Sequence, residues 1–206
     1  NSLSAAYVIM GFTLVLVMGS VDTYDNNVVT EGTNIESLDR LLFLDGSPEA
    51  QTMRKDLILY ATSIVKDEWP SISNGGSEVT SALMKKLSSD LIHLTPETTK
   101  QNILFTDIVR KRDQVIHSRE ARLLDDSGGL PVLFWTLSYL YLFGVAIICA
   151  LRLSHATPLR IIALSTQLTM LSLIFSAVMI IDHPFKGDTR ISPTPIIQAI
   201  QLMSER

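Results

Sequence analysis

Three long stretches without a charged residue constrain the fold of this chain more than any other feature. They run from Leu3 to Gly19, from Ser127 to Leu151 and from Ile161 to Ile181. At about 1.5 Å per helical residue, each can cross a hydrocarbon core of roughly 30 Å. The chain is also 47% hydrophobic with a mean hydropathy of +0.28, which is high for a soluble domain. We therefore expect an integral membrane protein with three transmembrane helices.

Charged residues are concentrated between the first and second of these stretches. Residues 21–130 hold 18 acidic and 12 basic residues, a net charge of −6. This acidic balance argues against nucleic acid as a partner, because phosphates require a concentrated basic surface. Cys149 is the only cysteine. An intrachain disulfide and a cysteine-based zinc site are therefore excluded.

These patterns divide the chain into four parts and predict an all-α membrane protein. The parts are a transmembrane helix (1–20), an extramembrane helical domain (21–130), a transmembrane hairpin (131–182), and a C-terminal turn with a short amphipathic helix (183–206). The hairpin follows from the short link between its two spans, which leaves room only for a turn between antiparallel helices.

Within the domain, apolar residues recur at helical spacing and predict four helices. The first span continues as a helix to Leu44, and Ser47 caps a helix over Pro48–Glu68. A shorter helix covers Ser77–Leu94, and Thr95 caps a helix that ends at Leu124. The predicted buried faces are Met53, Leu57, Tyr60, Ala61 and Ile64; Val79, Leu83, Leu87 and Leu91; and Ile103, Leu104, Ile108, Val115 and Ile116.

Two segments allow more than one interpretation. The third span is rich in serine and threonine, which suits close packing between helices or a polar face toward a cavity. The amphipathic segment Pro195–Met203 is expected on the membrane surface or against a neighbouring subunit.

The distribution of basic residues predicts the orientation of the domain. More Lys and Arg residues flank the spans on the domain side than in the link 152–160. By the positive-inside rule, we expect a cytoplasmic domain on a bacterial-type cytoplasmic membrane or an organellar equivalent.

Five short motifs together resemble the bestrophin-like membrane proteins, a family of unknown function. The resemblance extends from about Gly11 to Ile191. The motifs are Glu31-Gly-Thr-Asn-Ile35, Asp67-Glu68-Trp69-Pro70, Arg119-x-x-Arg122, Leu130-Pro131 with Trp135, and Asp182-x-Pro184-Phe185-x-Gly187.

The resemblance carries expectations about topology and activity. Members of this family usually have two spans before the domain, so a further helix is expected upstream of Asn1. His183 stands where the family more often has arginine. The bestrophins, to which the family is compared, are homo-oligomeric anion channels, and the resemblance thus implies a channel by analogy of fold.

Four charged residues near the spans are candidates for an ion path or an ion-pair network: Glu31, Arg119, Arg122 and Asp182. Glu31 could line an ion path, but pairing with Arg119 or Arg122 is the favoured interpretation. The two arginines could form an anion-attracting ring in an oligomer, or snorkel to lipid headgroups and pair with acids. Asp182 is expected to cap a structural turn through Pro184, Phe185 and Gly187.

A pore would require small or polar residues along its axis. The candidates are Thr13, Ser20, Ser165, Thr169 and Ser172. We expect no enzymatic activity and no cofactor, because the histidines do not fall at metal-ligand spacings and no phosphate loop or nucleophile elbow occurs. The expected partners are the lipid bilayer, further copies of the chain in a symmetric homo-oligomer, and other membrane-complex subunits. A homo-oligomeric anion channel is the first hypothesis, and a non-conducting assembly subunit is the alternative.

Overall fold

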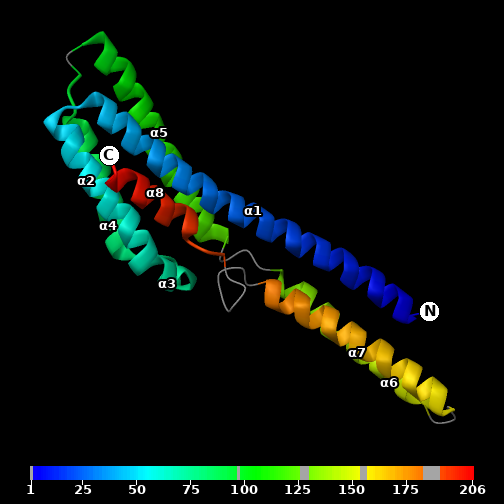
Figure 1. Cartoon of the computed structure of the whole chain (residues 1–206). Helices are drawn as coiled ribbons and strands as arrows, with labels where there is room; N and C mark the ends of the chain where they lie inside the picture. Colours follow the sequence, from blue (N-terminus) through cyan, green and yellow to red (C-terminus); the bar gives the residue numbers. More distant parts are fainter. Residues whose placement is uncertain (1, 97, 126–129, 154–156, 183–190) are drawn as a thin grey trace. The chain divides into compact units, whose positions relative to one another are not determined.

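The computed structural model describes residues 2–96, 98–125, 130–153, 157–182 and 191–206. Over these ranges it is helical and contains no β-strand, which confirms the all-α prediction. The elements in order (Figure 1) are α1 (Ser2–Asp45), α2 (Pro48–Ser63), the π-helix η1 (Ile64–Glu68), α3 (Trp69–Ser71), η2 (Ile72–Asn74), α4 (Glu78–Asp90), η3 (Leu91–His93), α5 (Thr99–Asp125), α6 (Val132–Leu153), α7 (Pro158–Ile181) and α8 (Thr194–Ser204).

Among the described helices, α1, α6 and α7 are long and apolar enough to cross a membrane. The three predicted spans are therefore confirmed. The chain divides into two compact units. The helix α1 belongs to both, because its N-terminal part lies in one unit and its C-terminal part in the other. We call residues 1–22 and 128–190 the membrane unit, and residues 23–127 and 191–206 the helical domain.

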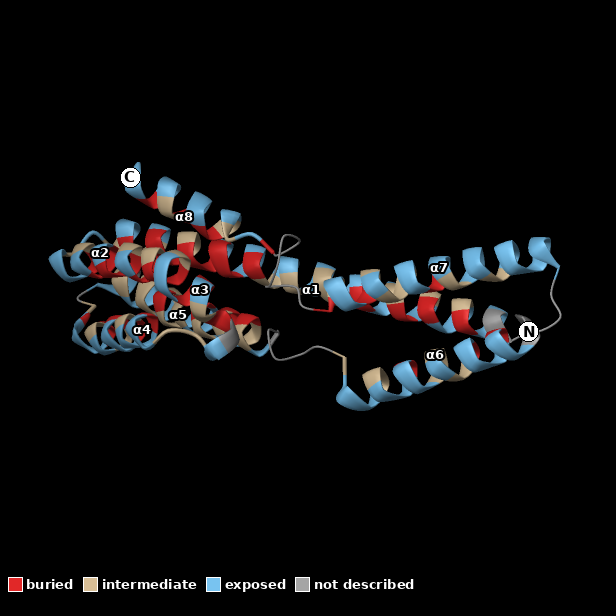
Figure 2. Cartoon of the chain, turned by 90° about the horizontal axis from the view of Figure 1, so that it is seen from below, coloured by how far each residue is buried: buried red, intermediate tan, exposed pale blue. Residues whose placement is uncertain are grey.

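The membrane unit is held together by a small core between α1, α6 and α7. Ala6, Met10 and Leu171 are each 1% exposed at its centre. The Tyr7 hydroxyl on α1 donates a hydrogen bond of 2.6 Å to the carbonyl oxygen of Gln167 on α7. Most other residues of α6 and α7 are exposed (Figure 2), as expected where lipid or another helix surrounds them.

In the helical domain, α2 buries the face that its sequence predicts. All five predicted residues of this face are at most 2% exposed. The Ser47 side chain accepts a hydrogen bond of 3.2 Å from the Ala50 N–H, and Pro48 occupies the first turn, so the predicted cap is confirmed. The helix α4 packs on α2, and Leu87 and Leu91 of its predicted face are buried at 0% and 4% exposure. Only the start of the face differs, since Thr80 is buried and Val79 is 56% exposed.

Two expectations for α5 are wrong at its N-terminal end. The helix begins at Thr99, and the cap is Thr98, whose hydroxyl accepts a bond of 3.2 Å from the Gln101 N–H; it is not Thr95. Ile103 is 63% exposed, whereas Ile108 and Val115 further along α5 are buried as predicted.

The C-terminal helix α8 belongs to the core of the helical domain. It packs on α2 and buries Ile196, Ala199 and Met203, whereas Ile197 and Leu202 of its predicted apolar face are 38% and 44% exposed. Its expected place at the membrane surface or against a neighbouring subunit stays a prediction. A Cβ atom added at Gly32 of α1 would lie 2.8 Å from the carbonyl oxygen of Pro195. This close approach of two backbones requires glycine.

Candidate functional site

Four charged side chains meet inside the helical domain, and we call them the charged cluster: Glu31 of α1, Glu68 of η1, and Arg119 and Arg122 of α5. The side chains of Glu31, Glu68 and Arg122 are 0% exposed, and that of Arg119 is 13% exposed. Buried charges are stable only when they are paired and hydrogen-bonded. The stability of this part of the fold therefore depends on the ion pairs and hydrogen bonds within the charged cluster.

The π-helix η1 presents Glu68 to the charged cluster. The Trp69 N–H donates a hydrogen bond to the carbonyl oxygen of Ile64, five residues earlier, which makes this turn a π-turn. Pro70, the next residue, has no N–H to donate. Short π-turns of this kind occur frequently at functional sites. Glu68 is the last residue of the turn and points into the interior.

Arg122 bridges the two carboxylates. Its Nε lies 2.5 Å from Oε2 of Glu31, and its Nη2 lies 3.1 Å from Oε1 of Glu31 and 2.6 Å from Oε1 of Glu68. The guanidinium carbon also lies 5.2 Å from the centre of the Trp69 ring, within the range of a cation–π interaction. Such a charge-assisted, bidentate arrangement is among the stronger polar contacts in proteins.

Glu68 receives donors from several directions. The Nε of Arg119 lies 3.1 and 3.0 Å from its two carboxylate oxygens, and Nη2 of Arg119 also donates to it. The backbone N–H of Ser77 lies 3.4 Å from Oε2, and Arg119 reaches Ser81 Oγ at 2.9 Å. The charged cluster thus ties together α1, η1, α4 and α5.

The two carboxyls of the charged cluster differ in their acidity. Burial raises the pKa of Glu31, and the opposing effect of Arg122 does not fully compensate for it. Burial also acts on Glu68, but hydrogen bonds from Arg119 and the charge of Arg122 hold the pKa of Glu68 below its usual value. Burial raises the pKa of the Tyr60 hydroxyl well above its usual value, and both carboxylates add to this shift. Glu31 is therefore the carboxyl that accepts a proton most readily.

The structure brings together three of the four predicted charged residues. Glu31 pairs with Arg122, whereas Arg119 pairs with Glu68, a residue to which the sequence reasoning gave no role. Its position in the Asp67-Glu68-Trp69-Pro70 motif was the available signal. Because Arg122 is fully buried and both arginines are paired, neither extends to lipid headgroups as a free charge.

Asp182 lies apart from the charged cluster, in the membrane unit. Its Oδ1 accepts a bond of 2.8 Å from the Leu130 N–H, and its Oδ2 accepts one of 3.2 Å from Trp135 Nε1. Asp182 thus joins the end of α7 to the start of α6. The rest of the expected turn, Pro184, Phe185 and Gly187, lies outside the described residues.

The change Asp182→Ala should destabilise the membrane unit. It leaves the Leu130 N–H and the Trp135 indole without this acceptor, and the loss should be about 1–3 kcal/mol. Thermal unfolding of the purified chain in detergent measures it. Asp182→Asn keeps one carbonyl oxygen and should lose less, so equal losses for the two variants would contradict this role.

The five predicted pore-facing residues divide into two groups. Thr13 is 4% exposed and bonds to the Ile9 carbonyl oxygen, so it lies inside the membrane unit, and Ser20 is half-buried on α1. Ser165, Thr169 and Ser172 are exposed on one face of α7, at spacings of four and three residues. They form a row of hydroxyls that other elements of the described chain leave open.

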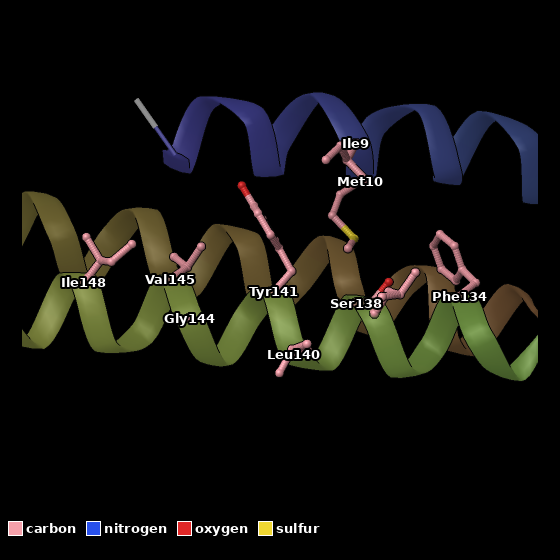
Figure 3. A pocket seen from close by; sticks show the side chains of 10 residues that line it. Ile9, Met10, Phe134, Ser138, Leu140, Tyr141, Gly144, Val145 and Ile148 are labelled. Carbon is pink, nitrogen blue, oxygen red and sulfur yellow. The ribbon is translucent and has the colours of Figure 1, made fainter.

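A groove of about 600 Å³ lies between α1 and α6 in the membrane unit (Figure 3). Met10 projects from α1 toward α6, and Tyr141 projects from α6 toward α1. The lining residues are Ile9, Met10, Phe134, Leu137, Ser138, Leu140, Tyr141, Gly144, Val145 and Ile148, none of them charged. The groove suits an apolar chain and offers little to an ion.

Comparisons with known proteins identify a family. A family model described as the Bestrophin-like domain matches residues 2–196. No curated protein and no solved structure matches the chain. Within the described ranges, no three His, Cys, Asp or Glu side chains are grouped as a metal site requires.

Proposed function

Because this membrane protein belongs to the bestrophin-like family, we propose that it assembles into a symmetric homo-oligomer that conducts small anions. The observation that carries the proposal is the exposed row of hydroxyls on α7. A bond to its own helix makes such a hydroxyl tolerable in lipid, as for Thr169, which donates to the Ser165 carbonyl oxygen at 2.9 Å. Three exposed hydroxyls on one face of a span also suit contact with water, which can hydrogen-bond to them in addition.

The membrane unit itself supports a path between copies. The groove between α1 and α6 is apolar, so it offers no polar route through a single chain. The face of α7 that carries Ser165, Thr169 and Ser172 is open to a neighbour. Repeated around an axis, these hydroxyls would line a narrow pore with groups that can replace part of an ion's hydration shell.

We place the helical domain on the cytoplasmic side. Basic residues that flank the spans on the domain side support this orientation by the positive-inside rule. The acidic net charge of residues 21–130 does not oppose it, because the rule counts Lys and Arg near the spans rather than net charge.

Anion flux from liposomes tests the channel. Vesicles that contain the purified chain should release chloride, and Thr169→Leu should reduce the rate by on the order of tenfold, since a hydrophobic constriction excludes water from a pore. Thr136→Leu is the matched control, because Thr136 is also an exposed hydroxyl that bonds to its own helix, at the Val132 carbonyl oxygen, but lies on α6 rather than on α7. Its flux should match that of the parent chain.

Two outcomes would contradict the proposal that the protein is a channel. One is a homogeneous oligomer without chloride release, and the other is equal flux in the two leucine variants. The first outcome would favour an assembly subunit of a larger membrane complex.

A further inference from the structure

The groove between α1 and α6 is lined only by residues of the membrane unit, and it follows α6 from Phe134 to Ile148 (Figure 3). Gly144 lies in its wall, and a Cβ atom added there would have no described atom within 4 Å. Packed protein interiors contain few voids larger than a water molecule. At about 600 Å³ the groove is far larger than such a void, so in the membrane another molecule fills it.

The groove is continuous with the surface of the spans that faces lipid. Its floor includes Met10 of α1 and Val145 of α6, which are buried. Its rim includes Ile9, Leu137 and Leu140, which are exposed at the outer surface of the membrane unit. Since none of the lining residues is charged, an ion or polar molecule would lose hydration there without gaining partners. The occupant is therefore apolar and enters from the bilayer.

The cross-section of the groove distinguishes a hydrocarbon chain from a helix. From Phe134 to Ile148 the groove is about 21 Å long at 1.5 Å per residue, so its mean cross-section is about 30 Å². An α-helix with its side chains is at least about 10 Å wide, which requires roughly 80 Å². A single hydrocarbon chain, with carbon–carbon contacts of about 4 Å on every side, requires roughly 20 Å². The groove thus accepts the chain and is too narrow for the helix.

The length of the groove agrees with the same occupant. Carbon–carbon bonds of about 1.5 Å advance an extended hydrocarbon chain by roughly 1.3 Å per carbon. About 16 carbons therefore cover the distance from Phe134 to Ile148. This is the length of an ordinary acyl chain in a membrane phospholipid.

We propose that the groove binds one acyl chain of a bilayer phospholipid, extended along α6 from Phe134 to Ile148. The chain contacts α1 through Met10, whose flexible thioether side chain adapts to an irregular apolar partner. It contacts α6 through Val145 and through the open face at Gly144. The bound chain joins α1 to α6 along this length. The inference depends on the groove alone and holds whether or not the protein conducts chloride.

Gly144→Leu tests the site by filling it. The full chain is purified in detergent, phosphatidylcholine is added in steps, and native mass spectrometry counts the lipids that remain bound. The parent should retain one phosphatidylcholine per chain. The variant should bind it at least about tenfold more weakly, because the leucine side chain displaces several methylene groups from their apolar contacts.

Gly11→Leu is the matched control. Gly11 also lies in a span, and an added Cβ there likewise has no described atom within 4 Å, but Gly11 does not line the groove. Leucine forms helix more readily than glycine, so both variants should fold. The control should bind phosphatidylcholine as the parent does. Equal retention of lipid by the parent and by Gly144→Leu, or equal loss in the two leucine variants, would overturn the proposal.

A photoreactive side chain identifies the occupant directly. Leu140, on the rim of the groove, is replaced by benzoylphenylalanine, and the chain is irradiated in phosphatidylcholine vesicles. The product should carry the mass of one phosphatidylcholine. A product that joins two copies of the chain would instead place a second copy over the groove and contradict the assignment.

Discussion

Replacing Arg122 by methionine is expected to lower the free energy of unfolding by about 3–5 kcal/mol, the usual cost of removing one partner from a buried ion pair. Glu31 would then lie fully buried without a cation, while Glu68 would keep Arg119. The cation–π contact with Trp69 would also be lost. Chemical or thermal unfolding of the detergent-solubilised chain, followed by circular dichroism, measures the change.

A second substitution distinguishes a stranded charge from poor packing. The double variant Glu31→Leu with Arg122→Met removes both members of the pair, and it should recover much of the loss, since apolar replacement of a whole buried pair is often neutral. Arg110→Met is the control. Arg110 is 68% exposed and pairs with Asp107 on the surface, so its removal should cost less than about 1 kcal/mol. A double variant as unstable as Arg122→Met would contradict the stranded-charge explanation.

The change Gly32→Val should destabilise the helical domain by about 3 kcal/mol, at the upper end for an overpacked core. The added Cβ meets the Pro195 carbonyl oxygen, a backbone atom that cannot rotate away as a flexible side chain would. Either α1 or the start of α8 must move. Unfolding in detergent gives the energy, and hydrogen exchange of the amides in α8 should become faster.

Gly11→Val is the matched control for this substitution. Gly11 also lies within α1, but among the described residues no atom lies within 4 Å of an added Cβ. Its change in stability should stay within about 0.5 kcal/mol. Slower or unchanged exchange of α8 in the Gly32 variant would show that the helix does not depend on this contact.

Periodicity and composition predicted the helices well because long apolar runs leave little choice. The three spans and the buried face of α2 follow from spacing alone. The residues at which helices begin and end were harder to predict. Thr95 and Thr98 are equivalent as caps by residue type, and only the actual start of α5 distinguishes them.

The spacing of residues along the sequence does not predict which side chains meet in the tertiary structure. The pairing of Arg119 with Glu68 depends on a π-turn that no local pattern of charge or hydrophobicity specifies. The apolar face of α8 was visible in the sequence, but amphipathicity does not indicate whether a helix packs on a membrane, on another subunit or on α2.

The π-turn at η1 also determines which insertions and deletions this part of the chain can accept. It holds one more residue than an α-helical turn would, and each residue of a helix rotates the side chains that follow by about 100°. Losing a single codon between Ile64 and Asp67 would convert the π-turn into an α-helical turn and leave the carboxylate at Glu68 close to its present direction, whereas an insertion of one further residue would turn it away from both arginines. Relatives with a one-residue gap at this point should therefore keep the acid and both arginines.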